Sequence, residues 1–281
     1  MRFKAFLRIQ LHQLIVRWRW LLPLPVMGFL SYLLSNAIII RNPPAFLSQS
    51  GATNMVNSWD ALFTGFGNAY YMVFVIANLF LLLVCDSLPE SAIGQLAVFR
   101  LGSRKSWWAG KSLSMLIAAF IYTLAGMVLL LGLTSLRLGF SWEWSKFGWS
   151  GDTILVPALF LQSSSPLATA LVLFGMDVLG FWALGMLMQV VTLLTRRYLL
   201  GYLTALFVLI GSMGISGSLV NVADGLKLFP AIRNLVMTFY PYPFREVAMG
   251  WSYVYWGICL TALYLLGYIL SRRQNYYSKE Q

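Results

Sequence analysis

The chain has 281 residues, of which 59% are hydrophobic and only 10% are charged. Soluble domains carry about 25% charged residues, so the composition excludes an ordinary soluble enzyme and predicts an all-α polytopic membrane protein. The formal net charge of +11 comes from Lys and Arg that concentrate in alternate loops, which indicates membrane orientation rather than nucleic-acid binding. The two cysteines, Cys85 and Cys259, lie in or at the end of apolar runs, and their spacing predicts neither a disulfide framework nor a metal site.

Residues 1–19 predict an amphipathic helix that lies in the plane of the membrane. At about 100° per residue, one apolar stripe is flanked by basic residues whose long side chains reach lipid headgroups. The stripe consists of Phe3, Leu7, Leu11, Leu14 and Trp18, and the flanking residues are Arg8, His12 and Arg19. We interpret His12, the only histidine, as a headgroup contact rather than a catalyst. The alternative is that these residues are only the cytoplasmic overhang of the first span.

Six apolar segments are long enough to cross a bilayer, which takes about 20 residues. They are Trp20–Ile40, Asn68–Cys85, Ser112–Leu136, Pro166–Thr195, Tyr198–Val220 and Trp251–Leu270. The first is too long for the apolar region of a signal peptide, so we interpret it as a retained span. We therefore expect a single domain over residues 1–281, with the in-plane helix at 1–19, six spans within 20–270 and a cytoplasmic tail at 271–281.

The positive charges predict which side each loop faces. Fourteen Lys and Arg lie on the side that holds both termini and the loop after span two, and six lie on the other side. Cytoplasmic loops carry the excess of Lys and Arg, so both termini and residues 86–111 are expected in the cytoplasm. On the opposite side, Trp142, Trp144 and Trp149 are typical of an interfacial aromatic belt. The apolar patches 226–232 and 235–239 are too short to span, and we expect re-entrant or surface half-helices there.

The loop from Asp86 to Lys111 is the polar segment with the most specific pattern. Its middle, Ile93–Leu101, is expected to form a short helix with Ile93, Leu96 and Ala97 on one side. A short amphipathic helix beside a membrane either lies on lipid or docks on another protein. We favour docking over a loop that only fixes topology, because topology alone requires no apolar face.

This loop also carries a motif, in which an acid and a Gly precede the hydrophobic helix and Ser-Arg and Gly-Lys lead into span three. The matching residues are Glu90, Gly94, Leu96, Ser103-Arg104 and Gly110-Lys111, and Pro241 with Phe244-Arg245 precedes the last span. With the six spans and the N-terminal helix, this pattern resembles the membrane subunit of ABC transporters of the ABC-2 exporter type. The family has a cytoplasmic coupling helix between spans two and three and re-entrant helices before span six.

The resemblance implies a permease subunit of an ATP-driven exporter in a bacterial plasma (inner) membrane, and not an enzyme in its own right. Two such subunits, identical or homologous, would pair with two cytoplasmic ABC ATPases, which hold ATP and Mg; no cofactor is expected in this chain. The residues expected to couple to the ATPase are Glu90, Gly94, Leu96, Arg100, Arg104 and Lys105. The sequence itself lacks a phosphate-binding loop, because Lys105 stands where Gly110-Lys111-Ser112 would require the earlier glycine.

Two other functions remain open from the sequence. Gly214-Ile-Ser216-Gly217 matches the motif of rhomboid-like serine proteases, but His12 is outside the predicted spans and cannot serve as the base. Asp177 is the only acid well inside a predicted span, and an intramembrane carboxylate suggests proton or cation coupling in a translocation path. The alternative function is therefore an ion-coupled carrier or a stand-alone membrane immunity or accessory protein. The structural interpretation of Asp177 is a carboxylate that is hydrogen-bonded at a helix interface or lies at a vestibule.

Overall fold

The computed structural model describes residues 3–41, 56–88, 101, 103–146, 164–216, 229–236 and 250–273. These residues form helices and connecting turns, and no strand occurs among them. Six helical segments in the described ranges are long and apolar enough to cross a membrane. The predicted all-α, six-span architecture is confirmed, and the chain is a multi-pass membrane protein.

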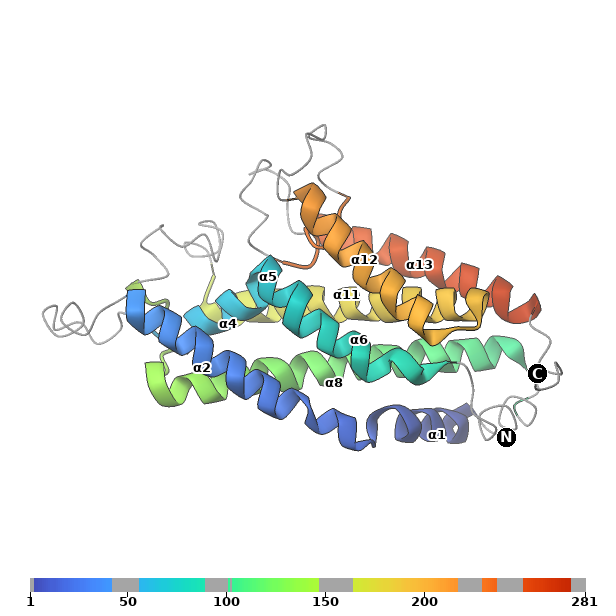
Figure 1. Ribbon diagram of the computed structural model, residues 1–281, viewed down its shortest axis with the longest axis horizontal. Coiled ribbons are helices and arrows are strands. Elements are labelled where there is room, and N and C mark those ends of the chain that lie inside the picture. Colours follow the sequence, from blue (N-terminus) through green and yellow to red (C-terminus); the bar gives the residue numbers. More distant parts are fainter. Residues whose placement is uncertain are drawn as a thin grey trace, which may run out of the picture.

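The helices carry the labels of Figure 1 and follow one another along the chain. They are α1 (Phe3–Ile15), η1 (Trp18–Leu21), α2 (Pro23–Arg41), α4 (Ser58–Gly67), α5 (Ala69–Tyr71), η2 (Met72–Ala77), α6 (Asn78–Val84), η3 (Cys85–Ser87), α8 (Arg104–Leu138), α11 (Pro166–Thr195), α12 (Tyr198–Ser216) and α13 (Gly250–Arg273). The η2 segment is a π-helix. Apart from the start of α8, the predicted spans agree with these helices, and residues 217–220 of the fifth lie outside the described residues.

Local sequence signals explain where several helices begin. Asn57 and Asp60 form a reciprocal capping box at the start of α4. The side chains of Ser103 and Ser165 accept hydrogen bonds from backbone amides of α8 and α11. After α11, Arg196 adopts φ 59°, and this left-handed residue turns the chain directly into α12.

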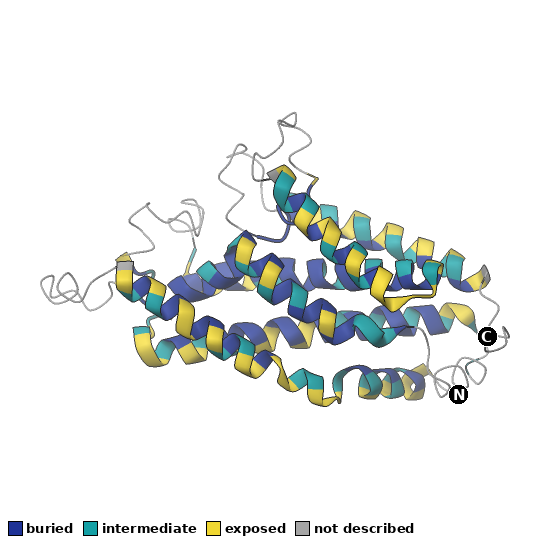
Figure 2. Ribbon diagram, viewed as in Figure 1, coloured by how far each residue is buried: buried dark blue, intermediate teal, exposed yellow. Residues whose placement is uncertain are grey.

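Helices α8 and α11 form the centre of the bundle (Figure 1). Helix α8 packs against α1, α2, α4 and α11, and α11 packs against α12 and α13 as well. Figure 2 shows that α11 is largely buried, while α2, α12 and α13 each expose one face. Those exposed faces are apolar, as expected for helices that contact lipid or another membrane protein.

Helix α8 is longer than predicted. It has 35 residues and begins at Arg104, whereas the predicted span begins at Ser112. At about 1.5 Å per residue it is about 52 Å long, against about 30 Å for the hydrocarbon core. Its extra turns carry Trp107 and Trp108, which are both fully buried. Arg104 and Lys105 therefore belong to the first turn of the third span.

Helices α1 and α2 follow one another along α8. Phe6 of α1 packs over Gly110, and Met27 of α2 packs near Gly126. The two helices therefore lie side by side with successive parts of α8 (Figure 1).

The face of α1 that packs in the bundle shares only Leu14 with the predicted apolar stripe, and contact of that stripe with lipid stays a prediction. The residues buried in α1 are Phe6, Gln10 and Leu14, whereas Phe3 is 37% exposed and Trp18, beyond the end of the helix, is 75% exposed. The physical reason is tertiary: a Cβ at Gly110 would lie 2.5 Å from the Phe6 ring, so the glycine makes room for this face of α1. The in-plane orientation of α1 stays a prediction.

Before α13, residues 230–236 enter the bundle as a buried turn. The backbone amide of Ile232 donates to Ser212 Oγ at 3.1 Å, and Trp256 Nε1 donates to the Asn234 carbonyl at 2.9 Å. Leu235 occupies the space left by Gly180. The predicted half-helices 226–232 and 235–239 lie only partly within the described residues. Of the described part, Phe229 is exposed and residues 230–236 are buried.

Candidate functional site

A region with several polar contacts between helices lies at one end of the bundle, where α8 begins and where α6, α11 and α13 end. We call it the basic end. Asp86 of η3 faces two arginines from the other side of the bundle: Arg17 Nη1 contacts Oδ2, and Arg19 Nη2 donates to Oδ1 at 2.7 Å. These ion pairs join the start of the first span to the end of the second.

Lys111 provides a second connection at the basic end. This residue is only 3% exposed, and its Nζ donates to the Ser87 carbonyl at 2.8 Å. A cation near the C-terminal carbonyls of a helix is favoured by the helix dipole. Gln189 of α11 donates from Nε2 to Ser87 Oγ at 3.2 Å, so α8 and α11 converge on the same residue.

The start of α8 is also tied to the end of α13. Arg104 Nη1 donates to the Arg272 carbonyl, and Trp108 Nε1 donates to the Tyr264 carbonyl at 2.9 Å. A Cβ at Gly267 would overlap the Trp108 ring, so this contact requires a residue without a side chain.

These contacts bracket the loop that the sequence predicts to dock on a partner. Asp86 and Ser87 hold the helix before the loop, and Trp108 and Lys111 hold the helix after it. A displacement of the loop would therefore act on η1, α8, α11 and α13 together. The arrangement suits the transmission of movement.

The predicted coupling residues divide into two groups. Glu90, Gly94, Leu96 and Arg100 lie outside the described residues. Arg104 and Lys105 are exposed in the first turn of α8, and Arg104 joins that turn to α13 through the Arg272 carbonyl.

Asp177 lies in the middle of α11 and is fully buried. Neither carboxylate oxygen has a hydrogen-bond partner among the described residues. The two nearby tyrosines, Tyr122 and Tyr253, lie within electrostatic range of the carboxylate. Their hydroxyls donate elsewhere, to the Ile76 carbonyl at 2.6 Å and to the Val172 carbonyl at 2.9 Å. Among the described residues, nothing supplies the hydrogen bond of the structural interpretation, and its other form, a carboxylate at a vestibule, stays a prediction.

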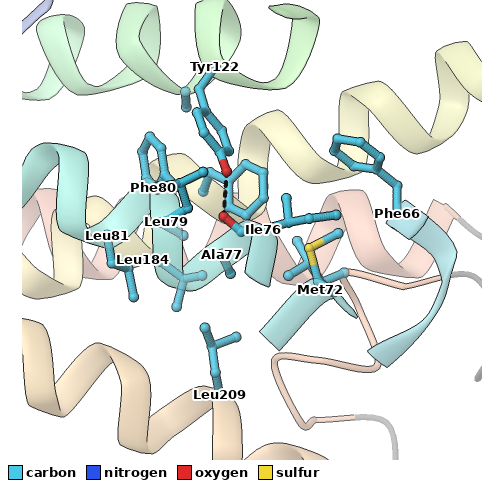
Figure 3. Close-up of a cluster of buried hydrophobic side chains, with 14 of the residues drawn as sticks. Phe66, Met72, Ile76, Ala77, Leu79, Phe80, Leu81, Tyr122, Leu184 and Leu209 are labelled. Atoms are coloured by element: carbon cyan, nitrogen blue, oxygen red, sulfur yellow. Dashed lines mark hydrogen bonds between the residues drawn. The ribbon is translucent and has the colours of Figure 1, made fainter. Parts of the chain in front are cut away.

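Tyr122 joins this region to the π-helix of the second span. Figure 3 shows its hydroxyl pointing at the Ile76 carbonyl within η2. Its ring packs on Phe80 and Phe181, with ring centroids 5.3 Å and 5.7 Å away. A π segment disturbs the regular backbone hydrogen bonds of a helix, and such segments are frequent at functional sites. The sequence carries no signal for this segment.

A contrasting polar network lies at the opposite end of the bundle, which we call the distal end. Asp60 of α4 precedes the second span and is buried. Its Oδ2 accepts a hydrogen bond from the backbone amide of Asn57 at 2.8 Å, and its Oδ1 accepts one from the Ser145 hydroxyl at 2.7 Å. Burial raises the pKa of Asp60 to about 6, against the smaller opposing effect of these two hydrogen bonds. Trp144, predicted to be interfacial, is partly buried at this end, Trp142 is exposed, and Trp149 lies outside the described residues.

Sequence reasoning missed the partners that assemble the basic end. In the sequence, Arg17 is only a topology signal and Arg19 is also predicted to reach lipid headgroups, whereas the structure pairs both with Asp86. Neither Ser87 nor Gln189 stands out. One usable signal exists: Asp86 and the two arginines are predicted on the same side of the membrane with opposite charge. The ranges that the structure describes hold no group of three or more His, Cys, Asp or Glu that could hold a metal ion.

Comparison with protein-family models, with curated proteins and with solved structures finds no match for this chain. The function is therefore inferred from the residues and their geometry.

Proposed function

We propose that the chain is the membrane-spanning permease subunit of an ATP-driven exporter of the ABC-2 type. In this proposal the permease forms the translocation path in the plasma (inner) membrane, with both termini in the cytoplasm. A separate cytoplasmic ABC ATPase binds and hydrolyses ATP with Mg, and a second permease copy or homologue completes the complex.

The observation that carries the proposal is the bracketing of residues 89–103 at the basic end. A pump that is driven from outside the membrane needs a protruding element whose movement reaches several spans. The contacts of Asp86, Lys111, Arg104 and Trp108 connect both sides of the loop to η1, α11 and α13. A loop that served only as a topology signal would have no need of these connections.

The proposed cycle follows from this connection. Closure of the ATPase on ATP pushes the loop, and the end of α6 and the start of α8 move with it. Because Lys111 and Gln189 meet at Ser87, α11 is displaced as well. The central helices α8 and α11 thereby alternate the access of the path between the two sides of the membrane.

The test is co-purification of the partner ATPase and its stimulation in nanodiscs. Leu96→Asp places a charge in the predicted docking face and is expected to abolish both, since an unpaired charge in a desolvated contact costs several kcal/mol. Gln95→Asp, which adds the same charge outside the predicted apolar face, is the matched control and is expected to keep both. If a correctly folded Leu96→Asp protein behaves like wild type, the coupling role is wrong.

Asp177 favours a second candidate function, an ion-coupled carrier. A buried carboxylate without a hydrogen-bond partner in the described ranges is costly, and such groups commonly take part in proton or cation transfer. The two candidates differ in their energy source. Transport in vesicles that requires ATP and a co-purifying ATPase supports the exporter, and transport driven by an imposed ion gradient alone supports the carrier.

A further inference from the structure

A groove runs between α1 and the middle of α8, separate from the basic-end contacts. It has a volume of about 480 Å³. Leu7, Leu11 and Ile15 form its wall on α1, and Ile117 and Ile121 form its wall on α8. The face of α1 that packs against α8 is the one that carries Phe6 and Leu14. The groove is therefore a second apolar face of α1, left open beside the first.

The α8 wall of this groove belongs to a membrane-spanning segment. Ile121 is 38% exposed, and its neighbours Phe120 and Leu124 are also exposed. The groove is thus continuous with the apolar surface that α8 presents to the bilayer. A soluble protein segment would have to enter the hydrocarbon region to fill it, whereas a lipid chain is already there.

One edge of the groove is basic. Lys4, Arg8 and His12 follow one another at intervals of four residues, so they form a row along α1 beside the apolar row. All three side chains are exposed, and within the described ranges none of them has an ion-pair partner. Helix α1 contains no acidic residue, so nothing on the helix itself neutralises the row.

The row and the groove have a common direction. Phe6 packs at Gly110, near the start of α8, so Lys4 and Arg8 lie toward the basic end. Ile15 is the last residue of α1, and Ile121 lies about three turns after Gly110 in α8, so both lie further along the bundle. The groove thus has basic residues at one end and apolar residues along its length, which matches a molecule with an anionic head and a long hydrocarbon chain.

We propose that the groove between α1 and α8 binds one anionic phospholipid of the leaflet at the basic end. One acyl chain lies between the Leu7–Leu11–Ile15 row and Ile117 with Ile121, and the headgroup phosphate contacts Lys4 and Arg8. Basic pockets beside membrane helices bind anionic headgroups in this way. This site does not depend on the proposed transport function. The bound lipid would fill the groove between α1 and α8.

The experiment measures lipid binding to the full-length protein in detergent by native mass spectrometry. Phosphatidylglycerol and phosphatidylcholine with identical acyl chains are titrated separately. Wild type is expected to bind the first phosphatidylglycerol at least tenfold more tightly than phosphatidylcholine. The double variant Lys4→Gln/Arg8→Gln is expected to lose about 30-fold in phosphatidylglycerol affinity, at about 1 kcal/mol per basic residue, with phosphatidylcholine binding unchanged.

Two further variants test the location. Arg196→Gln/Arg197→Gln removes the same number of exposed charges from the α11–α12 turn and is expected to bind phosphatidylglycerol like wild type. Ile117→Trp narrows the groove and is expected to weaken both lipids. Size-exclusion profiles and unfolding temperatures confirm that each variant is folded, and the charge variants replace only exposed side chains.

Four results would overturn the proposal. The first is equal affinity of wild type for the two lipids, and the second is an equal loss in the Arg196→Gln/Arg197→Gln control. The third is displacement of phosphatidylglycerol by an equal concentration of free glycerol phosphate, which would indicate an anion site that does not bind an acyl chain. Co-purification of a protein that is displaced by Ile117→Trp, in place of lipid, would likewise count against it.

Discussion

At the distal end, Asp60 is buried and accepts hydrogen bonds from the Asn57 amide and the Ser145 hydroxyl. At the basic end, the side chain of Asp86 is 35% exposed and faces Arg17 and Arg19. The first aspartate is held by short, neutral groups. The second is held by two long charged side chains that are 69 and 67 residues away in the chain.

The difference indicates which end is built to move. Short hydrogen bonds in a buried capping box fix one geometry and are lost together. Exposed ion pairs contribute little to stability, and long side chains follow a displaced partner over several ångströms. We therefore expect the distal end to act as the fixed part of the bundle and the basic end as the adjustable part.

The largest expected effect is the pH dependence of stability that comes from Asp60. Burial raises its pKa from 3.8 to about 6, so the folded protein binds this proton more tightly than the unfolded chain does. Stabilisation from protonation is complete below about pH 3.8 and is lost as the pH rises through about 6. Between pH 4 and pH 7, wild type is expected to lose roughly 2 kcal/mol of stability relative to Asp60→Asn.

Thermal unfolding in detergent across this pH range measures the Asp60 effect as a difference between the two proteins. The Asp86→Asn protein serves as the control and is expected to follow wild type over the same range. If the wild type and Asp60→Asn curves run parallel, the distal end is not held by a buried titrating carboxyl group.

A loss of stability of similar or smaller size is expected from Gly267→Ala at the basic end. The new Cβ would overlap the buried Trp108 ring, and overpacking of this kind costs about 1–3 kcal/mol. Gly257→Ala on the same helix meets nothing within 4 Å and is the matched control. Unfolding temperatures of the two variants give the comparison, and equal values would show that α13 does not pack tightly on α8.

Breaking the ion pairs themselves should affect stability still less. Asp86→Asn is expected to cost under about 1 kcal/mol, because exposed ion pairs contribute about that much at most. If the basic end transmits movement, the same variant should reduce partner-stimulated ATP hydrolysis while the unfolding temperature hardly changes. A large loss of stability would instead make Asp86 part of a rigid structure, like Asp60.

The smallest effect is expected from Asp177→Asn. This substitution keeps the shape of the side chain and removes a charge that has no hydrogen-bond partner within the described residues. For an ATP-driven exporter, transport is expected to continue, with little change in stability. Collapse of transport in a protein that still assembles would favour the ion-coupled carrier.

Hydropathy predicts the six spans because the need to bury backbone polar groups in lipid acts on each helix by itself. It places the start of α8 too late because Arg104, Lys105 and Lys111 are charged. Lys111 is nonetheless buried, and its burial depends on neighbouring helices. The same limit applies to α1, where Gly110 rather than the apolar stripe selects the packed face.

The site is less predictable than the fold. Asp177 can be identified from the sequence, since a lone acid stands out in an apolar span. The ion pairs of Asp86 cannot be, because they join segments that are far apart in the chain. The contact of Gln189 with Ser87 depends on the packing of α11 against the end of α6, which no local pattern encodes.

The π-helix η2 has a consequence for every position that follows it in the second span. A π segment holds one residue more than an α-helix needs for the same turn, so residues beyond Ala77 are rotated by about 100° from the faces that a regular helix starting at Ala69 would give them. Asp86 thus reaches Arg17 and Arg19 from a register that a helical wheel assigns to another side. Deleting one residue within Met72–Ala77 would return the helix to α geometry, and it would turn the far end of the span away from its partners without altering a single residue there.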